Sequence, residues 1–211
     1  MKAPENLGLT PKIPTENDTA VVITLRYQTP SEWTETVLAD FDHFLLDHAA
    51  AEKKAAGMAI SMASHYPDKP ELVEAMAELA VEEMSHYREV VKLIHSRGGL
   101  TAADERDPYV NQLRKHLRKG SEAYFLDRLL LGGVIEARGA ERFGLIADAA
   151  EDGPIKRFYT SISRSEERHR TLFTDLAHRY FPADTVVQRL DEWLKLEAEI
   201  AARQPIRAAL H

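Results

Sequence analysis

Glu83-Met84-Ser85-His86 and Glu166-Glu167-Arg168-His169 are two Glu-x-x-His motifs, and they decide how this chain folds. A spacing of three residues places the glutamate and the histidine of each motif on one face of a helix. Each motif also has a single glutamate about thirty residues upstream, Glu52 for the first and Glu136 for the second. Four carboxylates and two imidazoles from four helices form the ligand set of a two-metal site inside a helical bundle.

The two halves of the chain repeat this pattern with a nearly constant offset. Glu136 lies 84 residues after Glu52, while Glu166 lies 83 residues after Glu83 and His169 lies 83 residues after His86. The repeat predicts two similar helical hairpins, each supplying one glutamate and one Glu-x-x-His motif. Such a pair of hairpins would create two metal positions related by approximate two-fold symmetry.

The repeat separates the expected ligands from acidic neighbours. Glu82 could share a helix face with His86, but the matching position in the second half is Ser165. Glu167 has the same difficulty, since its counterpart is Met84. The expected metal ligands are therefore the six residues that occur in both halves: Glu52, Glu83, His86, Glu136, Glu166 and His169.

The other histidines do not repeat. His48 lies one turn before Glu52, but its counterpart is Gly132, so we expect His48 to support the site from beside the ligands. Five others are interpreted as surface or ordinary packing residues: His43, His65, His95, His116 and His178.

Charge balance limits which ions the cluster would hold. Four ionised carboxylates around one core need cations, and two divalent metals balance them. The chain has no cysteine, and carboxylates with imidazoles and no thiolate suit iron or manganese. From the residues alone, hydroxylation, iron oxidation, peroxide dismutation and peroxide reduction all stay possible.

A small pocket beside the metals is a further expectation. Three glycines lie within one turn of Glu136: Gly132, Gly133 and Gly139. Close packing of helices is the simpler explanation for them. The alternative is that Gly133, Tyr159 and Phe173 border a space for oxygen or substrate.

Length and composition indicate one globular domain. The chain has 211 residues, 44% of them hydrophobic, and a net charge of -7, which argues against general affinity for nucleic acid. We see no leader and no apolar run long enough to span a bilayer, so we expect a cytoplasmic protein without a membrane partner. Residues 1–30 contain four prolines and predict an irregular arm, with a short extended stretch near residues 21–25.

Residues 31–211 predict an all-α bundle of four long helices with an additional C-terminal helix. Apolar residues recur at helical spacing, and proline or glycine residues mark the ends of the segments. The expected long helices cover residues 31–60, 70–97, 121–150, 155–180 and 184–200, and Asp107-Pro108 predicts the start of a shorter helix.

Four segments of the chain resemble one enzyme family. They are His48-Ala-Ala-Ala-Glu52, Glu82-Glu83-Met-Ser-His86-Tyr, Ile135-Glu136-Ala-Arg138-Gly-Ala-Glu-Arg142-Phe and Ser165-Glu166-Glu-Arg-His169, and they look like the tRNA hydroxylase of the MiaE type. The resemblance extends from about Trp33 to the last helix. It implies a ferritin-like fold and a non-haem di-iron monooxygenase, in which the same six residues bind two iron ions.

The resemblance also implies the substrate and the partners. The family hydroxylates the isopentenyl side chain of a methylthio-isopentenyl-adenosine beside the tRNA anticodon. Dioxygen would be the co-substrate, and an external electron donor, such as a reductase or a ferredoxin-type protein, would be needed. The oligomeric state is left open.

Two basic segments could contact RNA. Residues 111–120 contain four cations and no acid, and we expect Arg114, Lys115, Arg118 and Lys119 to face the tRNA. Arg157, Arg164, Arg168 and Arg170 surround the second motif. The simpler interpretation is a solvated helix face with intrahelical ion pairs, and for residues 164–170, beside Glu166 and Glu167, RNA contacts are an equally good one.

Two other classes of protein compete with the hydroxylase. A ferritin- or rubrerythrin-like ferroxidase or peroxide-handling protein would use the same ligands, although a rubrerythrin usually adds a cysteine-rich part that this chain lacks. A helical interaction protein with vestigial ligands is disfavoured by the complete set of six.

Overall fold

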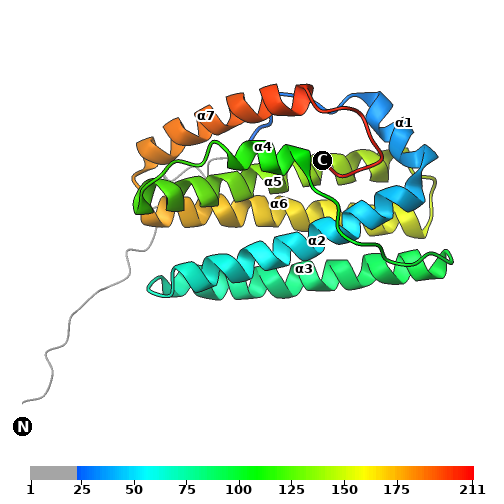
Figure 1. Ribbon diagram of the computed structural model, residues 1–211, viewed down its shortest axis with the longest axis horizontal. Coiled ribbons are helices and arrows are strands. Elements are labelled where there is room, and N and C mark those ends of the chain that lie inside the picture. Colours follow the sequence, from blue (N-terminus) through cyan, green and yellow to red (C-terminus); the bar gives the residue numbers. More distant parts are fainter. Residues whose placement is uncertain (1–22) are drawn as a thin grey trace, which may run out of the picture.

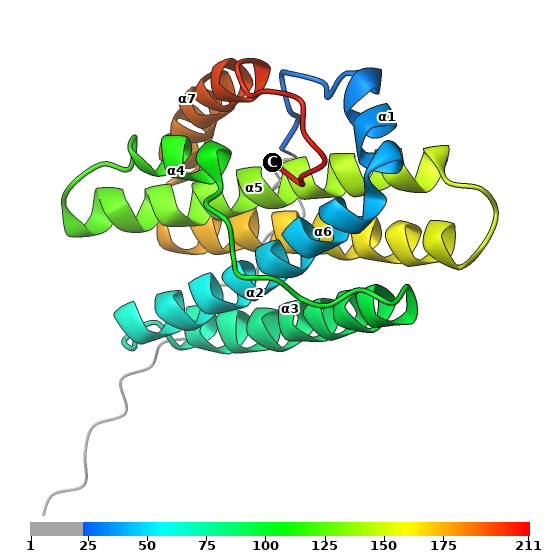
Figure 2. The same ribbon diagram turned by 45° about the vertical axis from the view of Figure 1, so that its right-hand side comes forward.

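Four long helices form the body of the protein, as two antiparallel hairpins that lie against each other (Figures 1 and 2). The computed structural model describes residues 23–211. The first hairpin is α2 (Phe41–His65) with α3 (Pro70–Ser96), and the second is α5 (Ser121–Ala149) with α6 (Pro154–Tyr180). The space between the two hairpins is where the repeated motifs meet.

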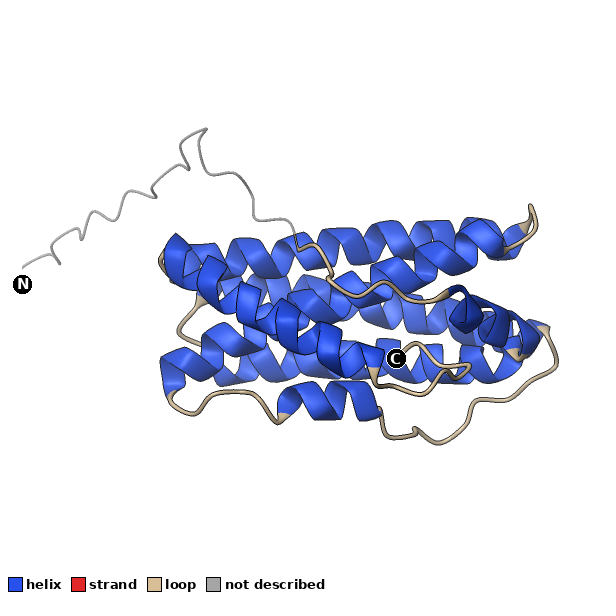
Figure 3. Ribbon diagram, turned by 90° about the horizontal axis from the view of Figure 1, so that it is seen from above, coloured by secondary structure: helices blue, strands red, loops and turns tan. Residues whose placement is uncertain are grey.

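Three further helices cover the second hairpin on the side away from the first. They are α1 (Ser31–Ala39), α4 (Pro108–Arg114) and α7 (Ala183–Ala202). Residues 23–211 contain no strand, as Figure 3 shows, so the predicted all-helical bundle with an additional C-terminal helix is confirmed. Within this range no helix is both long and apolar enough to cross a membrane.

Proline, glycine and aspartate residues mark the beginnings and ends of helices where the sequence predicts. Pro70 and Pro154 occupy the first turns of α3 and α6, where the missing N–H costs no helical hydrogen bond. Gly98 follows α3 with a φ of 82°, a left-handed conformation that favours glycine. The side chain of Asp107 accepts a hydrogen bond from the Val110 N–H at 2.9 Å, which caps α4.

The expected helix over residues 31–60 is wrong in one respect. The chain breaks at Asp40, whose φ of -131° and ψ of 56° are not helical, and α1 turns away from α2 there. The turn lets Trp33 and Val37 of α1 pack into the core, where both are buried. Residues 1–22 of the predicted arm lie outside the described residues, together with the first two residues of its expected extended stretch, and residues 23–30 lead to α1 without helix or strand.

The expected cap of the last helix is also wrong. Asp184 lies inside the first turn of α7, which begins at Ala183 without a side-chain cap. An acidic residue there still interacts favourably with the positive end of the helix dipole.

A buried polar network fixes α7 on the second hairpin. Glu197 of α7 accepts hydrogen bonds from Arg138 Nη2 of α5 at 2.7 Å and from the Tyr109 hydroxyl of α4 at 2.9 Å. Glu197 and Arg138 are both fully buried. Because the charges are paired, their burial is tolerated, but the loss of either partner would leave an uncompensated charge in the core.

This network predicts a large loss of stability in Glu197→Ala. Removing the carboxylate leaves the Arg138 guanidinium buried and lowers the free energy of unfolding by about 3–5 kcal/mol. Urea denaturation would measure the change. Glu199→Ala, two residues away at an exposed position, is the matched control and should change the free energy by less than about 0.5 kcal/mol. Equal effects of the two substitutions would contradict this account of the network.

Candidate metal centre

The six side chains of the two motifs and their upstream glutamates converge between the hairpins. Glu52 comes from α2, Glu83 and His86 from α3, Glu136 from α5, and Glu166 and His169 from α6. All are buried except His86, whose side chain is 15% exposed. Four helices therefore supply the side chains to one interior site, as the sequence predicts.

The ligand atoms fall into two overlapping groups. In the first, atoms of Glu52, Glu83, His86 and Glu166 lie within 4.8 Å of one another. In the second, the same holds for Glu83, Glu136, Glu166 and His169. Glu83 and Glu166 belong to both groups, while Glu52 with His86 and Glu136 with His169 belong to one each.

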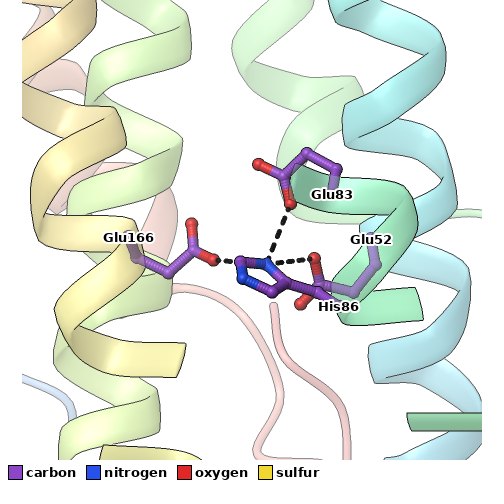
Figure 4. A group of neighbouring side chains, drawn as sticks. All are labelled: Glu52, Glu83, His86 and Glu166. Carbon is purple, nitrogen blue, oxygen red and sulfur yellow. Dashed lines mark ion pairs between the residues drawn. The ribbon is translucent and has the colours of Figure 1, made fainter. Parts of the chain in front are cut away.

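The shared glutamates direct one oxygen to each side. The Oε2 atom of Glu83 lies 3.4 Å from His86 Nδ1, and its Oε1 atom lies 3.0 Å from His169 Nδ1. The two oxygens of Glu166 lie 3.7 Å and 3.4 Å from the same two nitrogens. Figure 4 shows the first group around His86, with Glu52 Oε2 at 3.5 Å. Two carboxylates placed in this way can bridge a pair of metal ions.

Unpartnered polar atoms support a metal site at this position. Four buried atoms of the cluster have no hydrogen-bond partner among the described residues: Glu83 Oε1, His86 Nδ1, Glu166 Oε1 and His169 Nδ1. Buried polar groups are normally paired, because desolvation without a partner costs free energy. Oxygen and imidazole donors that converge without partners fit iron or manganese.

Two side chains beside the cluster, His48 and Glu82, form hydrogen bonds with its expected ligands. His48 Nε2 lies 2.6 Å from Glu52 Oε1, and the Tyr159 hydroxyl lies 3.2 Å from the other ring nitrogen of His48. Glu82 Oε2 lies 3.0 Å from His169 Nε2. His48 thus lies beside the ligands as expected. Glu82 also has a place at the site, which a search for repeated residues overlooks because its counterpart is Ser165.

The electrostatics of the cluster follow from burial and mutual contact. Burial raises the pKa of Glu136 and of Glu166 well above the ordinary value, and the neighbouring carboxylates add to the shift of Glu136. Burial would also raise the pKa of Glu52, but the hydrogen bond from His48 and the nearby imidazole of His86 outweigh it and lower that pKa.

The pKa values of both motif imidazoles are raised, which favours the charged form. Burial opposes their charge, but the close carboxylates of Glu52 and Glu83 raise the pKa of His86 to about 9. For His169, the close carboxylate of Glu83 and the charge of Glu136 overcome burial in the same way, and the pKa is again about 9. In the absence of metal, the cluster thus balances its carboxylates with protons.

The expected pocket at Gly133 is wrong, because side chains fill the space. A Cβ atom at Gly133 would meet Ile23 Cδ1 at 2.9 Å and Phe173 Cβ at 3.2 Å, and one at Gly132 would meet the Phe173 ring at 2.8 Å. Both glycines therefore allow close packing of α5 against α6. Phe173 belongs to the core, and Tyr159 lies behind His48 with its hydroxyl directed to that ring.

The basic segment at residues 111–120 lies away from this centre. Arg118 donates to the buried carboxylate of Asp127 on α5, and Arg189 of α7 binds the same carboxylate. Arg114, Lys115 and Lys119 are exposed. The segment is thus anchored to α5 and α7, and not to α3 or α6, which carry the two motifs.

Comparisons with known proteins agree with this geometry. The family model described as MiaE, tRNA-(MS[2]IO[6]A)-hydroxylase, matches residues 18–211. A tRNA 2-(methylsulfanyl)-N(6)-isopentenyladenosine(37) hydroxylase of Pseudomonas putida is 35% identical over 152 residues, which cover 72% of this chain and 74% of the relative. A protein of the same name from Salmonella typhimurium is 28% identical over 130 residues, which cover 62% of this chain and 47% of that relative.

A solved structure shares the fold. Protein 43 with aldehyde deformylating oxygenase activity from Synechococcus superposes with a TM-score of 0.84 and 33% identity, over 89% of this chain and 94% of that chain. The family model covers nearly the whole chain, and the Pseudomonas relative matches most of it. With its ferritin-like bundle and its buried cluster of glutamates and histidines, the chain belongs to the MiaE family of tRNA hydroxylases.

Proposed function

We propose that the chain is a di-iron monooxygenase that hydroxylates the isopentenyl side chain of a methylthio-isopentenyl-adenosine in tRNA. The overlap of the two ligand groups at Glu83 and Glu166 is the observation that carries the proposal. These two carboxylates would bridge the metals. Glu52 with His86 would complete one metal position, and Glu136 with His169 would complete the other.

The reaction needs dioxygen and a source of electrons. Two iron ions bound by these residues would supply the redox chemistry that reduces dioxygen and breaks an unactivated C–H bond. One oxygen atom enters that bond as a hydroxyl group, and the other leaves as water. The balance requires two electrons and two protons from an external donor, for which we propose a reductase or a ferredoxin-type protein.

Residues around the cluster would fix the orientation of the ligands. The His169 Nε2–H donates to Glu82, which directs Nδ1 into the site, where a metal would displace the Nδ1 proton. His48 donates to one oxygen of Glu52, so that the other oxygen faces His86. The Tyr159 hydroxyl in turn donates to His48. These contacts set the ring tautomers and carboxylate rotamers before a metal binds.

The domain organisation, the cell compartment and the RNA contacts are further parts of the proposal. We propose that residues 31–211 act as one bundle domain with residues 1–30 as an arm, in the cytoplasm, where tRNA is found. The exposed side chains of Arg114, Lys115 and Lys119, with Arg118, are the RNA contacts that the sequence predicts.

Two other activities could use the same site. The likeness to the Synechococcus protein favours aldehyde deformylation as a second candidate. The ligand set alone would also serve a ferroxidase of the ferritin or rubrerythrin type. All three activities consume dioxygen or a peroxide, so they are distinguished by their products.

The ligand assignment predicts how single substitutions change the metal content. Glu52→Ala removes a ligand of one position and should leave about one manganese or iron ion per chain, whereas Glu83→Ala removes a bridge and should leave none. Elemental analysis after desalting would measure the content. Glu74→Ala, at an exposed position of α3, should bind as much metal as the wild type. Full occupancy in the Glu83→Ala variant would show that the bridge is assigned wrongly.

The raised imidazole pKa values predict that metal binding strengthens as the pH rises. His86 and His169 carry protons below about pH 9 in the absence of metal, and a metal must displace them to bind Nδ1. The apparent affinity for Mn²⁺ should therefore rise roughly tenfold per pH unit for each proton displaced. Titration against a competing chelator between about pH 6 and 8 would measure it. An affinity that does not change over this range would argue against coordination through these nitrogens.

The proposed activity predicts a labelled product. Iron-loaded, chemically reduced protein under labelled dioxygen should add one labelled oxygen atom to the prenylated adenosine of tRNA, as detected by mass spectrometry of the nucleosides. Glu136→Ala should abolish this gain, because it removes a ligand of one metal position. Transfer RNA without the prenyl group is the control substrate.

Other products would identify the other activities. Oxygen consumption with ferric iron and an unchanged nucleoside would indicate the ferroxidase. Formate released from an added long-chain aldehyde, again with an unchanged nucleoside, would indicate deformylation.

A further inference from the structure

Three arginines form a stripe along the exposed face of α6. Arg157, Arg164 and Arg168 follow one another at spacings of seven and four residues, which places them on one side of a helix. They border a hollow of about 490 Å³ together with Lys156, Thr160 and Ser161. The border of this hollow thus contains four cations and two hydroxyl groups, and no carboxylate.

Ion pairs among the described residues leave most of the positive charge of the stripe uncompensated. Within residues 23–211, Arg157 and Arg164 form no side-chain ion pair, and both are exposed. Lys156 pairs with Asp152 at 3.1 Å, but Asp152 is almost fully exposed, and such a contact is worth little. By contrast, Arg170 on the same helix is paired with Glu167. The expected intrahelical pairing therefore accounts for Arg170 but not for Arg157 and Arg164.

The stripe ends beside the candidate metal centre. Arg168 Nη2 donates to Ser165 Oγ at 3.0 Å and lies 3.5 Å from Glu82 Oε2. Glu82 is the carboxylate that accepts a hydrogen bond from His169. A ligand bound along the stripe would thus reach the contact between α3 and α6, next to the Glu82 carboxylate that holds His169.

The charge reverses on the other side of Arg168. A second hollow, of about 560 Å³, lies between α3 and α6. Its border includes Glu78, Glu82, Glu167 and Asp175, with Arg168 as its one arginine or lysine. The acidic hollow repels phosphates and the basic hollow attracts them, so a nucleic-acid strand would lie on the side of Arg157 and Arg164 and end near Arg168.

We infer that the stripe of Arg157, Arg164 and Arg168 binds the phosphates of the tRNA strand that carries the prenylated adenosine. This inference rests on the proposed function and identifies the surface that would bind the tRNA substrate. A strand held along the N-terminal half of α6 would present its base to the α3–α6 contact. Residues 111–120 carry similar charge, but they span the end of α4 and the turn before α5 and border a separate hollow.

The test compares three pairs of substitutions that each remove two positive charges. Arg157→Gln with Arg164→Gln changes the stripe and spares Arg168, whose contacts reach Ser165 and Glu82. Arg114→Gln with Lys115→Gln changes the 111–120 segment. Lys195→Gln with Arg203→Gln changes exposed residues of α7 and is the control for net charge. Binding of labelled prenylated tRNA is measured by fluorescence anisotropy over a series of salt concentrations.

The stripe variant should bind tRNA on the order of tenfold more weakly at moderate salt. The slope of log affinity against log salt should also fall by roughly 1.4, because each lost phosphate contact on a single strand contributes about 0.7. In turnover with chemical reductant, the loss should appear in KM for tRNA and not in kcat. The α7 control should match the wild type in all three measurements.

Distinct results would overturn the inference. An unchanged affinity and slope in the stripe variant, with a loss in the 111–120 variant, would place the RNA on α4. Normal tRNA binding with slow turnover only when a protein supplies the electrons would make the stripe a docking site for an acidic electron donor. A wild-type protein that neither binds nor hydroxylates tRNA would overturn the proposed function itself, together with this inference.

Discussion

The burial of four carboxylates between two helical hairpins is the constraint on which the rest of the structure depends. Ionised glutamates cannot stay unpaired in a core. Burial raises the pKa values of Glu136 and Glu166, and nearby carboxylates raise those of the two imidazoles, so in the absence of metal bound protons offset part of the negative charge. Divalent cations would replace those protons. The cost of burying the cluster without compensation requires the helices to be held firmly against one another, since a small shift would separate the groups that balance each other's charge.

The approximate two-fold symmetry of the site is broken by its supporting residues. His48 holds Glu52 on one side, but the matching position on the other side is Gly132, against which Phe173 packs. Glu82 holds His169, but its counterpart Ser165 cannot supply a carboxylate to His86. At one metal position, the imidazole of His48 would therefore contact the ligand Glu52. At the other, the carboxylate of Glu82 would contact the ligand His169. Two metals in such surroundings would differ in ligand basicity.

The surface around the centre is organised by charge. The net charge of -7 is unfavourable for a protein that acts on RNA, so a local concentration of unpaired cations is needed to attract phosphates. The N-terminal half of α6 provides such a concentration, and the carboxylates around Glu82 limit it on the other side. Membership of the MiaE family indicates the substrate class, and the geometry of the cluster fits the two-metal site that this family's reaction needs.

The sequence by itself determined the helical bundle, the two hairpins and the six residues that meet between them, because helical periodicity and an offset of 83 or 84 residues are properties of the chain alone. The break at Asp40, the filling of Gly133 by Ile23 and Phe173, and the place of Glu82 against His169 were decided by the tertiary structure. Each of these depends on which helices become neighbours. The same holds for the basic residues: composition singles out residues 111–120, but only the fold places Asp127 beside Arg118 and leaves Arg157 and Arg164 without an acidic partner among residues 23–211. Local spacing fixes which residues share a helix face, whereas contacts across helices depend on packing that no local pattern encodes.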